Sequence, residues 1–76
     1  MDKKVFLLDR EHYTEKQVEN LTEKDLEKWV AEEDYTENYT IIKIDANDYS
    51  TPEAAIDGEG GGFYDIDDYY VIPFGF

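Results

Sequence analysis

Four consecutive large apolar side chains, Val5 to Leu8, constrain the fold of this chain more than any other stretch. Lysines precede the run and Asp9 and Arg10 follow it, which leaves too few residues for a helix. Neighbouring side chains of a β-strand point to opposite faces, so the run needs a strand that is covered on both faces or lies inside a sheet. We therefore predict a central strand at about 4–9.

Two helix-start signals follow this strand. Thr14 with Gln17 matches a capping box, and Thr22 with Asp25 repeats the arrangement further along the chain. Two caps so close together predict a two-part helix over about 15–33, with parts at about 15–20 and 23–33. Trp29 lies on the apolar face of the second part, so we expect it to anchor this helix on one face of the sheet.

Two more strands complete the expected sheet. The stretch at about 39–46 alternates between apolar and mixed side chains, and a helical segment separates it from the first strand, so we expect a right-handed crossover and a parallel pair. A third strand at about 69–73 ends near Pro73, which suits a strand end or a sheet edge. We expect it to pair with the free side of the 4–9 strand. The result is a three-stranded mixed sheet with the 4–9 strand in the centre.

A short helix at about 52–57 is the last regular element. Thr51 is its expected cap and Pro52 its first residue, where the missing amide hydrogen costs nothing. The glycine-rich segment 58–62 that follows is predicted to be a flexible loop. The chain as a whole, residues 1–76, is predicted to form a single small α+β domain.

The charge of the chain limits its partners. It carries 20 Asp and Glu against seven Lys and Arg, a formal net charge of −13 at pH 7. Proteins bind DNA, RNA and anionic lipid by neutralising phosphate with Lys and Arg, so direct nucleic-acid and membrane binding are disfavoured. All seven basic residues lie between Lys3 and Lys43, whereas Ile44 to Phe76 holds eight carboxylates and no cation. That half must keep its charge in water or meet a positive surface.

The sequence offers no convincing catalytic or cofactor motif. The glycine segment lacks the Lys and the Ser or Thr of a phosphate-binding loop. His12 is the only histidine and Ser50 the only serine, and they lie in separate links. We therefore expect neither enzymatic activity nor a cofactor, and a small enzyme of unknown reaction is the least favoured hypothesis. The residues after Met1 form no signal peptide or spanning segment, so we expect a cytoplasmic location.

Two oxygen-rich runs could bind a divalent cation weakly. One comprises Asp45, Asn47 and Asp48, and the other comprises Asp65, Asp67 and Asp68 with Glu59. The first lacks the third oxygen ligand, the turn glycine and the closing glutamate of a calcium loop. We assign a metal site to neither run and keep a weak calcium-binding domain as the alternative function.

The acidic and aromatic tail is the leading candidate for a functional surface. Its predicted partner-binding residues are Tyr64, Asp65, Asp67, Asp68 and Tyr69. Tyrosine rings provide contact area at low entropy cost, and neighbouring carboxylates can meet Arg or Lys of a partner. The competing interpretation is that the tyrosines belong to the core and the aspartates form a solvated rim. Our leading hypothesis is a non-catalytic module that binds a basic protein; one form of it is a mimic of nucleic-acid charge.

Overall fold

The computed structural model describes the backbone of residues 2–36 and 40–76, and the side chains in these ranges except those of 33–36. The elements in chain order are β1 (Lys4–Asp9), α1 (Glu15–Glu19), α2 (Glu23–Thr36), β2 (Ile41–Asp45), α3 (Pro52–Gly60), the 3-10 helix η1 (Ile66–Asp68) and β3 (Tyr69–Phe74). The strand order is β2-β1-β3, so the predicted α+β fold with β1 in the centre is confirmed.

All strand pairs in the sheet are antiparallel, and the predicted parallel pairing of β1 with β2 is wrong. The amide of Asp9 at the end of β1 donates to the carbonyl of Thr40 at 3.0 Å, just before β2 begins. The helical segment therefore leaves the sheet and returns to the same end, instead of crossing over to the other end as a parallel pair requires. β2 is shorter than the predicted 39–46, and Tyr39 lies outside the described residues.

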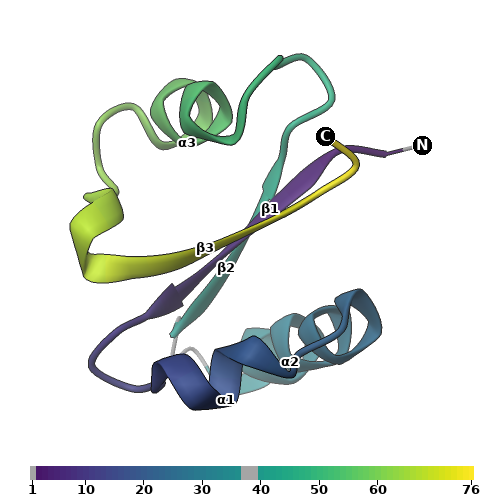
Figure 1. Cartoon of the computed structure of the whole chain (residues 1–76), viewed down its shortest axis with the longest axis vertical. Coiled ribbons are helices and arrows are strands. Elements are labelled where there is room, and N and C mark those ends of the chain that lie inside the picture. The colour runs from purple at the N-terminus through teal and green to yellow at the C-terminus, as the bar shows by residue number, and fades with distance from the viewer. Residues whose placement is uncertain (1, 37–39) are drawn as a thin grey trace.

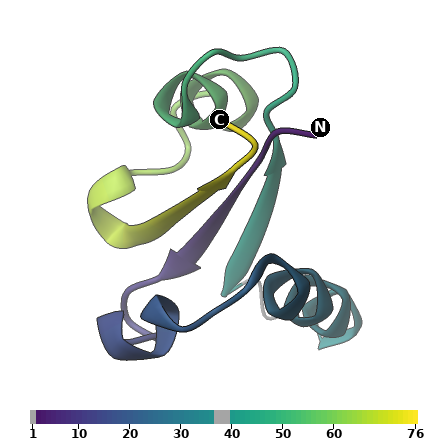
Figure 2. The ribbon, with the colours of Figure 1, turned by 45° about the vertical axis from the view of Figure 1, so that its right-hand side comes forward.

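Both faces of β1 are covered, as its unbroken apolar run requires. Val5, Phe6, Leu7 and Leu8 are all completely buried. Phe6 and Leu8 pack beneath α1 and α2, whereas Val5 and Leu7 pack beneath α3. Figures 1 and 2 show the resulting three layers, with α1 and α2 on one side of the sheet and α3 on the other. The tail strand β3 forms the edge of the sheet next to β1, as predicted.

Both predicted helix starts are present. The hydroxyl of Thr14 accepts from the amide of Gln17 at 3.3 Å, and the Gln17 side chain accepts from the amide of Thr14 at 2.8 Å. Thr22 and Asp25 make the same reciprocal pair, with both bonds 3.2 Å long. The hydrogen bonds that Thr22 donates to the Asp25 carboxylate lower the pKa of this group. Each cap satisfies amides that a helix start would otherwise leave without partners.

The side chain that anchors α2 is Leu26 rather than Trp29. Leu26 is fully buried against Phe6 and Leu8. Trp29 is only half-buried, and its ring stacks on Tyr13 with the centroids 5.6 Å apart and the planes 20° apart. Leu26 faces the sheet directly, whereas the Trp29 indole covers the side of the helical layer next to Tyr13, in the segment after β1.

α3 is longer than predicted and takes up part of the glycine segment. The Thr51 hydroxyl accepts from the amide of Ala54, and the helix continues to Gly60 before Gly61 ends it in the left-handed conformation at φ 55°. Gly58, Glu59 and Gly60 are therefore helical, and the loop predicted for them is wrong. The left-handed position at Gly61 is a common way for a helix to end, because glycine has no Cβ to clash there.

Candidate interaction surface

The predicted acidic patch comprises η1, the short helix between α3 and β3, and the residues on either side of it. The Asp65 carboxylate caps η1 by accepting from the amide of Asp67 at 3.0 Å. The carbonyl of Asp68 accepts from the amide of Arg10 at 3.0 Å, which fixes η1 beside the end of β1. Asp65, Asp67 and Asp68 are all exposed, so the three residues face solvent on a hydrogen-bonded turn.

The two tyrosines of the predicted patch flank this turn in the chain. The rings of Tyr64 and Tyr69 meet edge to face with their centroids 6.0 Å apart, and both are half-buried against the core beneath α3. Burial, followed by the nearby carboxylate of Asp9, raises the pKa of the Tyr69 phenol. Part of the competing interpretation therefore holds, because these tyrosines contribute to packing as well as bordering the acidic surface.

Sequence reasoning missed two apolar residues beside the patch. Phe63 is 91% exposed and Ile66 is 47% exposed. Neither belongs to the predicted partner-binding set. The available signal for Phe63 was an aromatic residue directly after a run of three glycines and outside any apolar period.

Arg10 is the basic residue tied to this part of the molecule. Its Nε donates to the carbonyl of Tyr69 at 3.3 Å, and its guanidinium lies 4.4 Å from the centroid of the Tyr70 ring. A shallow cavity of about 280 Å³ lies here and is lined by Asp9, Arg10, Glu11, Asp67, Asp68 and Tyr69. Four of the residues that line this cavity carry a carboxylate, so Arg10 compensates only part of the local negative charge.

The α3 layer, which we define as residues 47–68, is acidic throughout. Its carboxylates are Asp48, Glu53, Asp57, Glu59, Asp65, Asp67 and Asp68, and it contains no Lys or Arg. All seven are exposed, and none forms an ion pair with a described lysine or arginine side chain. The α1–α2 layer differs because it carries Lys16, Lys24 and Lys28 among its acidic residues.

Two lysines of the sheet, Lys4 and Lys43, form ion pairs on the opposite face. The ammonium of Lys4 contacts Glu23 at 2.6 Å and Glu27 at 3.0 Å, and Lys43 contacts Glu27 at 2.9 Å. The hydrogen bonds from Lys43 and then Lys4 lower the pKa of Glu27, while those to Glu23 and Glu27 raise the pKa of Lys4. These cations hold α2 to the sheet, on the face opposite to the α3 layer.

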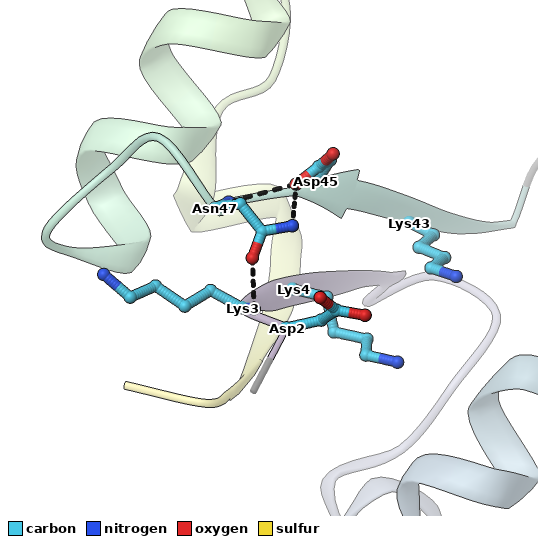
Figure 3. Close-up of a pocket in the computed structure, with 6 residues that line it drawn as sticks. All are labelled: Asp2, Lys3, Lys4, Lys43, Asp45 and Asn47. Carbon is cyan, nitrogen blue, oxygen red and sulfur yellow. Dashed lines mark hydrogen bonds between the residues drawn. The ribbon is translucent and has the colours of Figure 1, made fainter.

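The calcium-like run at Asp45 forms part of a turn at the other end of β1. The carboxylate of Asp45 accepts from the backbone and side-chain amides of Asn47, and Asn47 Oδ1 accepts from the amide of Lys3 at 2.9 Å (Figure 3). A cavity of about 230 Å³ lies here, and Figure 3 shows the Lys3 ammonium pointing away from those of Lys4 and Lys43. The side-chain oxygens of Asp45 and Asn47 thus stabilise the turn after β2 and do not face an open cation loop.

The structure places the sparse catalytic candidates apart. His12 Nδ1 lies 3.1 Å from Asp9 Oδ2 at one end of β1. Ser50 follows Tyr49, whose carbonyl accepts from the Lys3 ammonium at the opposite end of the strand. Within the described ranges, no group of three or more His, Asp or Glu side chains is arranged to hold a metal ion.

Comparisons of this chain with models of known protein families, with curated proteins and with solved structures found no match. Among residues 2–36 and 40–76, no helix is both long enough and apolar enough to cross a membrane.

Proposed function

We propose that this chain is a non-catalytic interaction module whose α3 layer binds a basic region of another protein. The observation that carries the proposal is the charge of that layer, in which seven exposed carboxylates have no lysine or arginine partner among the described side chains. The patch residues remain those predicted: Tyr64, Asp65, Asp67, Asp68 and Tyr69. The proposal keeps the cytoplasmic location that the sequence suggested.

The arrangement of charge supports a basic partner. Lys4 and Lys43 are paired with Glu23 and Glu27 on the opposite face, and the Lys3 ammonium donates to the carbonyl of Tyr49. The seven carboxylates of the α3 layer therefore outnumber the cations near them. A layer of one sign attracts the opposite sign, speeds association and repels partners of its own sign. Arg and Lys side chains of a protein satisfy this requirement, whereas phosphate groups of nucleic acid or lipid do not.

The fixed position of η1 also supports the proposal. The cap at Asp65 and the backbone bond between Arg10 and Asp68 fix the backbone that carries the carboxylates before a partner arrives. A preorganised charged surface loses less conformational entropy on binding than a disordered acidic tail. One form of the proposal is that the layer imitates the charge of a nucleic acid and occupies the nucleic-acid site of its partner.

The test is an affinity capture from the native host with three forms of the chain. The patch variant Asp65→Asn/Asp67→Asn/Asp68→Asn keeps the cap, because Asn can accept the same hydrogen bond. Its matched control, Glu15→Gln/Glu19→Gln/Glu32→Gln, removes the same number of exposed charges from the α1–α2 layer. We expect a basic protein that binds the wild type and the control but is lost from the patch variant. Equal capture by all three forms would contradict the proposal.

A competition experiment separates the two forms of the proposal. If the chain imitates nucleic acid, double-stranded DNA or RNA should displace it from the captured partner, with mutual exclusion at saturation. An ordinary adaptor would bind the partner together with nucleic acid. Salt titration alone does not distinguish the two, because both complexes are electrostatic.

A further inference from the structure

Phe63 is the most exposed large apolar side chain among the residues that the structure describes. The exposed ones are Phe63 at 91%, Phe76 at 48% and Ile66 at 47%. Phe76 has a contact, since the Lys3 ammonium lies 5.7 Å from its ring centroid. Single exposed apolar residues are common on proteins, but Phe63 and Ile66 occur together in the link that carries the acidic patch. This link thus combines apolar and acidic side chains.

The backbone around Phe63 holds its position. The amide of Gly61 donates to the carbonyl of Asp57 at 3.0 Å, and the amide of Phe63 itself donates to the carbonyl of Gly60 at 2.9 Å. The next residue, Tyr64, is packed against the core beneath α3. Phe63 is therefore presented to solvent by a hydrogen-bonded turn next to a packed residue, and its exposure does not come from an unstructured tail.

On these grounds we infer that Phe63 is the apolar anchor of the interaction surface, and that the basic partner has an apolar pocket rimmed by Arg or Lys. This inference rests on the proposed function. Aromatic side chains at the centre of an interface often dominate affinity, because they bury a large area and exclude water around neighbouring charges. Phe63 supplies that area, and Asp65 and Asp67 supply the charges that its partner must match.

Other occupants fit the surface less well. A second copy of the chain would bring the α3 layer, with its uncompensated carboxylates, against another of the same sign. An anionic lipid surface would be repelled for the same reason. A basic protein with an apolar pocket can bury the phenyl ring and neutralise the carboxylates together.

Binding of two arginine-rich peptides, measured by calorimetry at physiological salt, tests the inference. Both peptides have the same length and number of arginines, but one has serine and glycine spacers and the other has leucine and tryptophan among its spacers. We expect the apolar peptide to bind the wild type about tenfold more tightly. Phe63→Ala should abolish that advantage and leave binding of the serine–glycine peptide unchanged. Phe76→Ala, the matched control at the opposite end of β3, should retain the advantage.

The possible outcomes separate the two proposals. If both peptides bind equally and Phe63→Ala has no effect, the anchor inference is wrong while the acidic interaction surface stands. If the patch variant binds both peptides as well as the wild type does, the proposed function is wrong and the inference falls with it. Circular dichroism should show that Phe63→Ala is folded, because this side chain is almost fully exposed.

Discussion

The ring of Tyr64 occupies the space where a side chain at Gly60 would stand. A Cβ atom at Gly60 would lie 2.5 Å from Cδ2 of Tyr64, closer than two non-bonded carbon atoms can approach. The same relationship joins Tyr49 to Gly58, where a Cβ atom would collide with the phenol oxygen and the ring edge. At Gly58 and Gly60, near the end of α3, the absence of a side chain leaves room for the rings of Tyr49 and Tyr64. This need for space explains why the helix contains glycines, which weaken helices.

We predict that Gly60→Ala destabilises the protein, although alanine favours a helix by about 1 kcal/mol over glycine. The new methyl group must displace the Tyr64 ring from the core beneath α3, and the lost packing should outweigh the gain in helix propensity. Chemical denaturation of the variant provides the measurement. In a Tyr64→Ala background the same substitution should be neutral or stabilising. A stabilised Gly60→Ala single variant would contradict the packing role.

Gly61→Ala serves as a conformational comparison for that experiment. A Cβ at Gly61 meets nothing within 4 Å, but its φ of 55° is strained for an L-residue. The loss should be about 1 kcal/mol, and it should not depend on Tyr64. Gly61→Asn should be tolerated better, because asparagine enters the left-handed region more readily.

Leu26→Ala should be more damaging than Trp29→Ala. Leu26 is fully buried between α2 and the sheet, so its truncation leaves a cavity and should cost about 2–5 kcal/mol. Trp29 is half-buried and stacks on Tyr13, so we expect a loss of about 2 kcal/mol. Urea denaturation of both variants gives the comparison. A larger loss for Trp29→Ala would restore the indole as the anchor of α2.

Glu27 should stabilise the protein at neutral pH and cease to do so in acid. Its hydrogen bonds with Lys43 and Lys4 lower its pKa below the ordinary value of 4.5. A group whose pKa is lower when folded contributes stability above its unfolded pKa and loses it as the pH falls through the folded value. Glu27→Gln should therefore lower the free energy of unfolding by about 1 kcal/mol or less at pH 7, because solvent screens these partly exposed ion pairs. The difference in this free energy between the variant and the wild type should shrink as the pH falls below the ordinary pKa of Glu27. Chemical denaturation of the wild type and the variant from neutral to acidic pH tests this prediction. A difference in stability that stays constant with pH would show that the ion pairs are not its cause.

Thermal stability should rise when sodium chloride is added at low ionic strength. The Debye length is about 30 Å at 0.01 M, comparable with the extents of the molecule, which are 28 × 26 × 25 Å. Every carboxylate then repels the others across the whole protein, whereas at 0.15 M the Debye length is about 8 Å and only near neighbours interact. Melting temperatures measured across this range should increase for the wild type. They should increase less for the Asp65→Asn/Asp67→Asn/Asp68→Asn variant, and a flat wild-type profile would mean that the charges are already compensated.

The sequence predicted the local elements well. The caps at Thr14, Thr22 and Thr51 fixed where the helices begin, because each depends on side chains within three residues of the cap. The patch aspartates are exposed on and beside η1, as their composition suggested. The exposure of Phe63 was missed, although its position directly after three glycines and outside any apolar period was a signal for it. Whether these residues bind a partner stays a prediction.

By itself, the sequence determined that Val5 to Leu8 form the central strand. Four adjacent apolar side chains point alternately to two faces, and both faces must be removed from water whatever surrounds them. Only the tertiary structure decided that β2 runs antiparallel to β1, and that α3 rather than a second long helix covers the other face. Strand direction depends on the end of the sheet to which α2 returns the chain, and the close packing at Gly58 and Gly60 depends on the positions of the Tyr49 and Tyr64 rings in the folded protein. These arrangements depend on how the chain packs in three dimensions, so the pattern of apolar and polar residues alone did not specify them.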